Sequence, residues 1–278
     1  MIQLNFLILA IHVTKLPIQQ KFKLVLSLIK QERSVISWRE WRELCYVHHL
    51  KTHLNWGLAE EIDQSSTYIS IADERYPDFL ADIYRPPLIL FYEGDPSLLN
   101  QQGISLVGSR KMSSYGQRAI SHILTQIAKS EDLNQLPIIS GLALGVDGWS
   151  HRMALKNKLR PIGIIGTGLD VFYPSAHKNL QLDVATKGLL LSEYFPGTSP
   201  RKHHFPSRNR IIAGLSSKVI IVEAEEKSGS LITANLALQE NRDIFAVPGN
   251  MDSGLSVGTN QLIQAGATPL LDVSDLTI

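Results

Sequence analysis

Residues Ile104-Ser-Leu-Val-Gly-Ser-Arg110 carry the pattern from which the fold of this chain follows. A short, mostly apolar run enters a glycine turn, and a helical segment over 116–129 comes next. Strand-like apolar runs alternate with helical segments in the same way from Tyr68 onward. Apolar runs without alternation predict strands covered on both faces, and the helical segments between them predict crossover connections. We therefore expect an α/β fold with a doubly wound, mostly parallel sheet.

The N-terminal part has a different pattern, with apolar residues at helical spacing. Phe22, Val25 and Ile29 recur there at helical spacing, and a Gln-Ser-Ser turn at 64–66 indicates a boundary. We expect a small helical domain at 1–62 and the sheet domain at 63–278. The expected strands lie at 88–92, 104–107, 137–140, 162–165, 189–191, 219–222, 244–247 and 268–271, and the expected helices at 116–129, 151–158, 176–186, 231–240 and 258–264.

Composition sets broad limits on function. The 278 residues carry a net charge of +1, with 44% apolar and 19% charged residues, which is typical of a globular protein. This balance excludes a uniformly basic nucleic-acid coat but allows a local basic stripe. Cys45 is the single cysteine, so no intrachain disulfide can form. The apolar run Phe6–Ile11 lacks the flanks of a signal peptide, and we expect a cytoplasmic protein without membrane contact.

Glycine turns follow several of the expected strands. In doubly wound folds, ligands bind at the carboxyl ends of the strands. The turn Gly108-Ser109-Arg110 offers close backbone approach and a guanidinium for phosphate oxygens. Ser114 with Gln117 reads as a capping box that opens the next helix. These features predict a phosphate pocket.

The densest charge lies in Arg201-Lys-His-His-Phe-Pro-Ser-Arg-Asn-Arg210, which holds four arginine or lysine residues. Cations beside an aromatic ring are what sequence-tolerant binding of a single strand requires. Phe205 supplies the ring, and Asn209 adds a neutral polar group. The alternative is a solvated charged loop. We favour binding to a polyanion, since the following apolar residues anchor the segment to the core.

Other polar residues have less specific interpretations. Asp147 and His151 form either an acid–base pair or a helix cap with a packed histidine, and we favour the cap. Glu223 is either catalytic or holds the loop that contains Ser228, Gly229, Ser230 and Thr233. Cys45, His48, His49 and His53 complete no recognised zinc spacing, so we expect no metal site there.

Nucleotide-cofactor motifs are missing from the sequence. Gly163-Ile-Ile-Gly-Thr-Gly168 has its glycines in the order GxxGxG, the reverse of the dinucleotide fingerprint, and there is no P-loop. We therefore expect no cofactor.

Taken in order, the motifs resemble those of the DNA-processing DprA family, also called Smf. They are Val107-Gly-Ser-Arg110, Ser140-Gly-Leu-Ala-Leu-Gly-Val-Asp147, Gly166-Thr-Gly-Leu-Asp-Val-Phe-Tyr-Pro174, Leu191-Ser-Glu-Tyr194, His204-Phe-Pro-Ser-Arg-Asn-Arg-Ile-Ile-Ala-Gly214, Val222-Glu-Ala-Glu225, Ser228-Gly-Ser-Leu-Ile-Thr-Ala234, Ala246-Val-Pro-Gly249 and Gly258-Thr-Asn-Gln-Leu-Ile-Gln-Ala-Gly-Ala267. The resemblance extends from about residue 68 to residue 271.

The resemblance implies an extended Rossmann-like domain that binds single-stranded DNA without hydrolysing anything. It also implies homodimerisation, loading of the recombinase RecA onto DNA taken up in natural transformation, and a SAM-like N-terminal domain. By position, it assigns phosphate binding to Gly108, Ser109 and Arg110, and the DNA path to Lys202, Arg208, Asn209 and Arg210, with Phe205 as a stacking candidate.

Two departures from the family pattern stand out. Ser175 occupies the place where some relatives have a lysine, which leaves Lys178 as a possible substitute. The chain also ends soon after the last expected strand, so we expect no C-terminal winged helix.

Two other functions stay open. One is a nucleotide hydrolase of the lysine-decarboxylase-like group, although Val247-Pro-Gly-Asn250 lacks the second glycine of that group's motif. The other is an interaction protein whose basic segment meets an acidic partner. We favour the single-strand DNA-binding mediator.

Overall fold

A computed structural model describes residues 1–48 and 54–277 of the chain. It contains a nine-stranded sheet with the order β11-β10-β9-β5-β6-β7-β8-β4-β3. Its strands are β3 (Tyr68–Ser70), β4 (Ile89–Gly94), β5 (Gly103–Val107), β6 (Ile138–Ser140), β7 (Pro161–Ile165), β8 (Leu189–Ser192), β9 (Ser216–Ile221), β10 (Asp243–Ala246) and β11 (Thr268–Pro269). The strands from β5 to β11 pair in parallel, whereas β4 pairs antiparallel with both β8 and β3. The expectation of a mostly parallel α/β sheet is confirmed.

The strand order reverses next to β5. From β5 the chain builds β6, β7 and β8 outward in one direction, and it then returns to place β9 on the other side of β5. The carboxyl ends of β5 and β9 therefore flank the crevice where doubly wound folds bind ligands.

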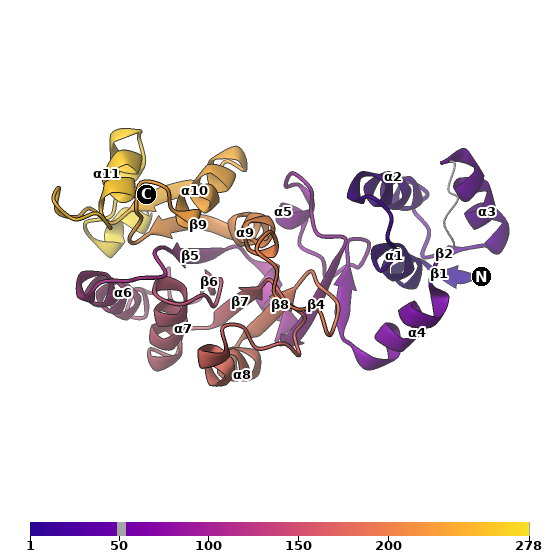
Figure 1. Cartoon of the computed structure of the whole chain (residues 1–278), viewed down its shortest axis with the longest axis horizontal. Helices are drawn as coiled ribbons and strands as arrows, with labels where there is room; N and C mark the ends of the chain where they lie inside the picture. Colours follow the sequence, from indigo (N-terminus) through magenta and orange to yellow (C-terminus); the bar gives the residue numbers. More distant parts are fainter. Residues whose placement is uncertain (49–53, 278) are drawn as a thin grey trace.

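Helices cover both faces of the sheet (Figure 1). The helices α5 (Asp78–Ala81), α9 (His204–Leu215) and α10 (Gly229–Gln239) pack on one face, and α6 (Ser114–Ile127), α7 (Val146–Lys156) and α8 (Lys178–Lys187) pack on the other. The two faces follow from strand alternation, because Val107 and Ile221 join the core under α9 and α10, while Leu106 and Ile220 join the core over α6 and α7. The helix α11 (Val257–Gln264) lies beside β10.

The N-terminal residues form a helical unit against the sheet edge. It consists of α1 (Leu4–His12), α2 (Ile18–Ile29), α3 (Trp38–Val47) and α4 (Trp56–Ser65), with a two-stranded pair of β1 (Ile2–Gln3) and β2 (Val35–Ile36). Its apolar core also includes Leu88, Ile89 and Phe91 near and within β4, so the unit packs directly on the sheet. Trp41 is buried in this core, whereas Trp38 is 48% exposed.

Some local expectations were wrong. No helix was expected over the basic segment, yet α9 spans His204–Leu215. The cap of α6 is Ser113, whose side chain accepts from the amide of Gly116 at 3.1 Å, and not Ser114. Within the described residues, no helix combines the length and apolar character needed to cross a membrane.

Candidate functional site

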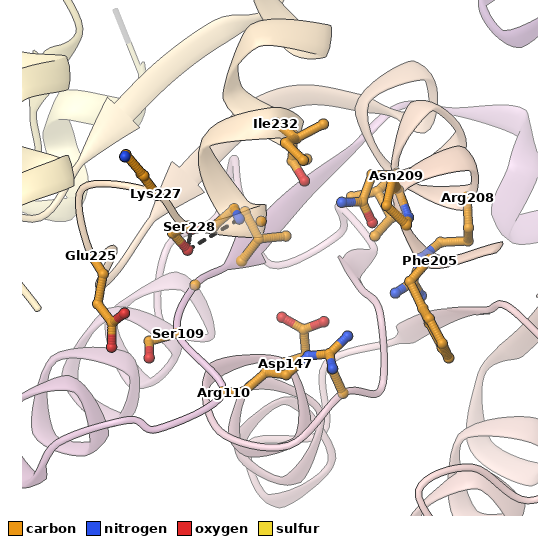
Figure 2. A pocket seen from close by; sticks show the side chains of 18 of the residues that line it. Ser109, Arg110, Asp147, Phe205, Arg208, Asn209, Glu225, Lys227, Ser228 and Ile232 are labelled. Atoms are coloured by element: carbon orange, nitrogen blue, oxygen red, sulfur yellow. Dashed lines mark hydrogen bonds between the residues drawn. The ribbon is translucent and has the colours of Figure 1, made fainter. Parts of the chain in front are cut away.

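A pocket lies at the point where the strand order reverses, with a volume of about 410 Å³ (Figure 2). Three segments form its walls: the turn after β5, the N-terminal part of α9, and the loop that opens α10. We call it the switch-point pocket. Its polar and aromatic lining residues are Ser109, Arg110, Lys111, Asp147, Lys202, Phe205, Arg208, Asn209, Glu225, Lys227, Ser228, Ser230 and Thr233.

The turn after β5 is fixed from two sides. The amide of Ser109 donates to the carbonyl of Glu223 at 2.8 Å, and its own carbonyl accepts from the amide of Val146 at 3.1 Å. A Cβ on Gly108 would lie 2.7 Å from the Val146 side chain and 2.9 Å from the Glu223 carbonyl. Glycine is therefore required at this position for close packing. The turn presents the exposed Arg110 as part of a rigid wall.

Arg110 and Phe205 meet across the mouth of the pocket. The guanidinium carbon of Arg110 lies 5.5 Å from the centre of the Phe205 ring, within the range of a cation–π contact. The ring also packs against Tyr173, with centroids 5.3 Å apart. The half-buried Phe205 thus presents a positioned aromatic surface beside a cation. Arg110 makes no ion pair with any residue in the described part of the chain.

Arg208 forms the floor of the pocket. It is 4% exposed and donates from Nη1 to the carbonyl of Gly141 at 2.8 Å, while its Nε has no hydrogen-bond partner within the described residues. Burial lowers the pKa of Arg208 to about 10. Burial also raises the pKa of the nearby Asp147 carboxyl, an effect that the positive charge of Arg208 opposes. The lining of the pocket therefore includes a buried cation, whose charge favours an anion in the cavity.

The third wall is the start of α10. Ser228 caps this helix and accepts from the amide of Ser230 at 3.3 Å. A Cβ added at Gly229 would meet nothing within 4 Å, so the first turn is open to the pocket. The exposed Lys227 precedes it. Backbone amides at a helix start favour anions, and here they act beside side-chain cations.

The charge of the lining is predominantly positive. Two carboxylates, Asp147 and Glu225, oppose five cations: Arg110, Lys111, Lys202, Arg208 and Lys227. Lys111 and Lys227 were not among the residues singled out from the sequence, and Glu225 was named only as part of a family motif. Lys227 could have been found, because it directly precedes the Ser228-Gly turn that was already a candidate.

Two expected DNA-contacting residues lie elsewhere. Arg210 is not part of the pocket: its Nη2 pairs with the Glu193 carboxylate at 2.5 Å, and its Nε donates to the carbonyl of Arg85 at 2.7 Å. Lys178 sits at the start of α8, with its ammonium 5.0 Å from the centre of the Phe172 ring. Of the nine residues expected to bind DNA or phosphate, the structure brings seven together and leaves Arg210 and Lys178 outside: the seven are Gly108, Ser109, Arg110, Lys202, Phe205, Arg208 and Asn209.

The supporting residues also differ in part from expectation. Glu223 is buried and holds Ser113, whose amide donates to Glu223 Oε2 at 2.9 Å, so it supports the turn after β5 rather than the loop before α10. Asp147 lies inside α7, where Gly145 is the N-cap. His151 is fully buried without a side-chain partner among the described residues, and burial lowers its pKa to about 3.

The histidines considered as metal ligands in the N-terminal unit are only partly described by the structure. His49 and His53 lie outside the described residues. Among the residues that are described, no group of three or more histidine, cysteine or carboxylate side chains is placed to hold a metal ion.

Comparisons with known proteins all point to the same protein family. The family model for DNA recombination-mediator protein A matches residues 67–278. The DNA processing protein DprA of Streptococcus pneumoniae is 47% identical over 210 residues, which span 76% of this chain and 72% of that protein. The protein of the same name from Bacillus subtilis is 42% identical over 220 residues, or 79% and 73% of the two chains.

Solved structures give the same result. The X-ray structure of DprA from Streptococcus pneumoniae superimposes with a TM-score of 0.89 at 37% identity, covering 100% of this chain and 98% of that one. DNA processing protein A of Helicobacter pylori, described for its single-stranded DNA binding mode, superimposes with a TM-score of 0.66 at 32% identity, covering 76% and 94%.

Proposed function

Because the chain belongs to the DNA recombination-mediator protein A family, we propose that it binds single-stranded DNA in the switch-point pocket. The observation that carries this proposal is the pocket floor. Arg208 is a buried cation with an unpartnered Nε, and it lines the same pocket as the exposed Arg110, at the crevice where this fold binds ligands. The Helicobacter pylori relative, whose structure is described for its single-stranded DNA binding mode, supports the choice of ligand.

The shape of the site favours an unpaired strand. Phosphates would contact Arg110 and Lys202 on the walls, and an unstacked base could pack beside Phe205. Such a contact requires a base whose face is free, which a duplex does not offer. Phosphate contacts carry no sequence information, so we expect binding that is strongly salt-dependent and tolerant of sequence.

The wider role that we propose is loading of the RecA recombinase onto the bound strand by a homodimer, during natural transformation. The family relationship supports this step. The appropriate measurement is the rate of RecA filament assembly on single-stranded DNA with and without the protein. An unchanged rate at saturating protein would contradict the loading role and leave DNA binding intact.

One observation favours a second candidate, a nucleotide hydrolase. Asp147 is a buried carboxyl with a raised pKa that lines a nucleotide-sized pocket, which is an environment suited to general acid catalysis. We prefer a structural role, because Asp147 compensates the charge of Arg208. Incubation with nucleoside monophosphates distinguishes the two: release of free base, lost in Asp147→Asn, would establish the hydrolase.

Binding itself is tested by fluorescence anisotropy with oligo-dT and with a duplex of equal length. We expect tighter binding of the single strand, and weakening as salt is raised. Equal or tighter binding of the duplex would contradict the proposed function.

A further inference from the structure

A second cavity lies on the other side of the turn that follows β5, with a volume of about 390 Å³. It is lined by Ser113, Tyr115, Arg118, Glu223, Asn250, Ser253 and Ser256, together with the backbone at Pro248-Gly249. Like the switch-point pocket, it opens beyond the carboxyl ends of parallel strands, in this case β5, β9 and β10. None of these residues belongs to the lining of the first pocket.

The two cavities share one rigid partition, the turn from Ser109 to Ser113. Glu223 holds this turn at both ends: its carbonyl accepts from the Ser109 amide at 2.8 Å, and its carboxylate accepts from the amide and hydroxyl of Ser113. Lys111 stands exposed on the partition between these two anchors and lines the first pocket. Lys111 of the first pocket and Ser113 of the second cavity are two positions apart in the chain, so the two cavities are close enough for one strand to reach both.

The chemistry of the second cavity suits a nucleotide. Arg118 is exposed and makes no side-chain hydrogen bond or ion pair with the described residues, so its guanidinium is available to a phosphate. Tyr115 is 40% exposed, and its hydroxyl donates to the carbonyl of Pro248 at 2.6 Å, which fixes the ring in place. A held aromatic ring is a platform for a base. Asn250 and Ser253 add hydrogen-bonding groups for a base edge or a sugar.

We propose that this cavity is a second nucleotide subsite for the same DNA strand. Arg118 contacts the phosphate and Tyr115 stacks on the base, while Lys111 bridges the two subsites. The proposal rests on the proposed function, because it extends the path of the strand that occupies the switch-point pocket. It makes the DNA footprint of one subunit longer than the first pocket alone would require.

The test compares Arg118→Gln with Arg152→Gln, using anisotropy with oligo-dT of increasing length. Arg152 is an exposed arginine on α7 that lines neither cavity. We expect Arg118→Gln to bind a dinucleotide like the unmodified protein but to bind a long oligomer on the order of tenfold more weakly. Its log–log salt slope should fall by about 0.7, the value for one phosphate contact of a single strand.

A second pair of variants tests the stacking contact. Tyr115→Phe keeps the ring but loses the hydroxyl that holds it, so it should bind long oligomers more tightly than Tyr115→Ala, which should lose on the order of tenfold. Matching urea midpoints for the two variants would exclude misfolding as the cause.

The outcomes separate the two proposals. If Arg118→Gln and Arg152→Gln behave alike at every oligomer length while Arg110→Ala is impaired, the second subsite is wrong and the proposed function stands. If the unmodified protein fails to bind oligo-dT at all, both are wrong.

Discussion

Arg208 and Arg210 stand two residues apart on α9 and occupy opposite environments. Arg208 faces the switch-point pocket, where it has one neutral carbonyl partner and an unpartnered Nε. Arg210 faces away from the pocket, and Glu193 and two backbone carbonyls hold its guanidinium. Two residues along a helix correspond to a rotation of roughly 200°, so neighbouring charges in a sequence point to different sides. The number of charges in the basic segment therefore overstates how many are available to a ligand.

The environment of Arg210 extends to the N-terminal unit. Glu193, its ion-pair partner, also accepts at its backbone carbonyl from His12 Nε2 at 3.0 Å, and Lys21 donates to the carbonyl of His12 at 2.5 Å. Burial lowers the pKa of His12 to about 4, so this histidine is neutral at pH 7. The polar chain joins α1 and α2 to the end of β8 and to α9. We infer that Arg210 contributes to stability and that Arg208 contributes to binding as well.

Among the substitutions, replacement of the pocket arginine should have the largest effect on stability. Arg208→Met leaves Asp147 without its compensating cation, and loss of one member of a buried charge pair costs about 3 kcal/mol. We expect that decrease in the free energy of unfolding by urea, together with weaker binding of oligo-dT. Stability equal to that of the unmodified protein would mean that Asp147 and Arg208 are not coupled.

Acidic pH should lower the stability of the protein through two buried histidines, one near Arg208 and one near Arg210. The pKa of His151, a buried residue of α7, is lowered to about 3, and that of His12 to about 4. The unfolded chain takes up protons near pH 6.5 while the folded protein does not, so stability falls as the pH drops below 6.5. Between pH 6.5 and 4.5 each histidine should contribute a loss of about 2–3 kcal/mol.

Urea unfolding at a series of pH values measures this loss. His12→Gln can still donate to the Glu193 carbonyl, and it should flatten the profile by the share that His12 contributes. A variant with the same pH profile as the unmodified protein would show that folding does not change the pKa of His12.

Loss of Arg210 should have a smaller effect, and one of a different kind. Arg210→Met leaves Glu193 largely buried without its ion pair, and we expect about 2 kcal/mol lower stability. Because Arg210 lies outside the pocket, affinity for oligo-dT under conditions where the protein is folded should not change. A decrease in affinity with unchanged stability would place Arg210 on the DNA path after all.

Much of the sheet could be predicted from the sequence. Most of the strands contain a short apolar run, and several are followed by glycine turns, so their burial on both faces was visible in stretches such as 104–108. Helix α9 was missed, because its first half carries charges, His204 and Pro206, and only its second half, from Ile211 to Leu215, is apolar. Without an apolar period in the first turns, the segment reads as a loop.

The site could be predicted only in part. Residues on turns after strands, such as Arg110, were located by the rule that ligands bind at the carboxyl ends. The placement of Arg210 could not be predicted, because its partner Glu193 lies 17 residues away in the sequence and only the tertiary fold brings the two together. The same holds for Glu223, which supports a turn 110 residues before it.

The most direct test is a salt titration of oligo-dT binding by Arg110→Ala and Arg210→Ala, measured side by side with the unmodified protein. We expect Arg110→Ala to bind on the order of 1–2 kcal/mol more weakly, with a log–log salt slope that is about 0.7 shallower, because one phosphate contact is lost. Arg210→Ala should retain the slope of the unmodified protein. Unchanged slope and affinity in Arg110→Ala, or equal losses in the two variants, would contradict the assignment of the switch-point pocket as the DNA site.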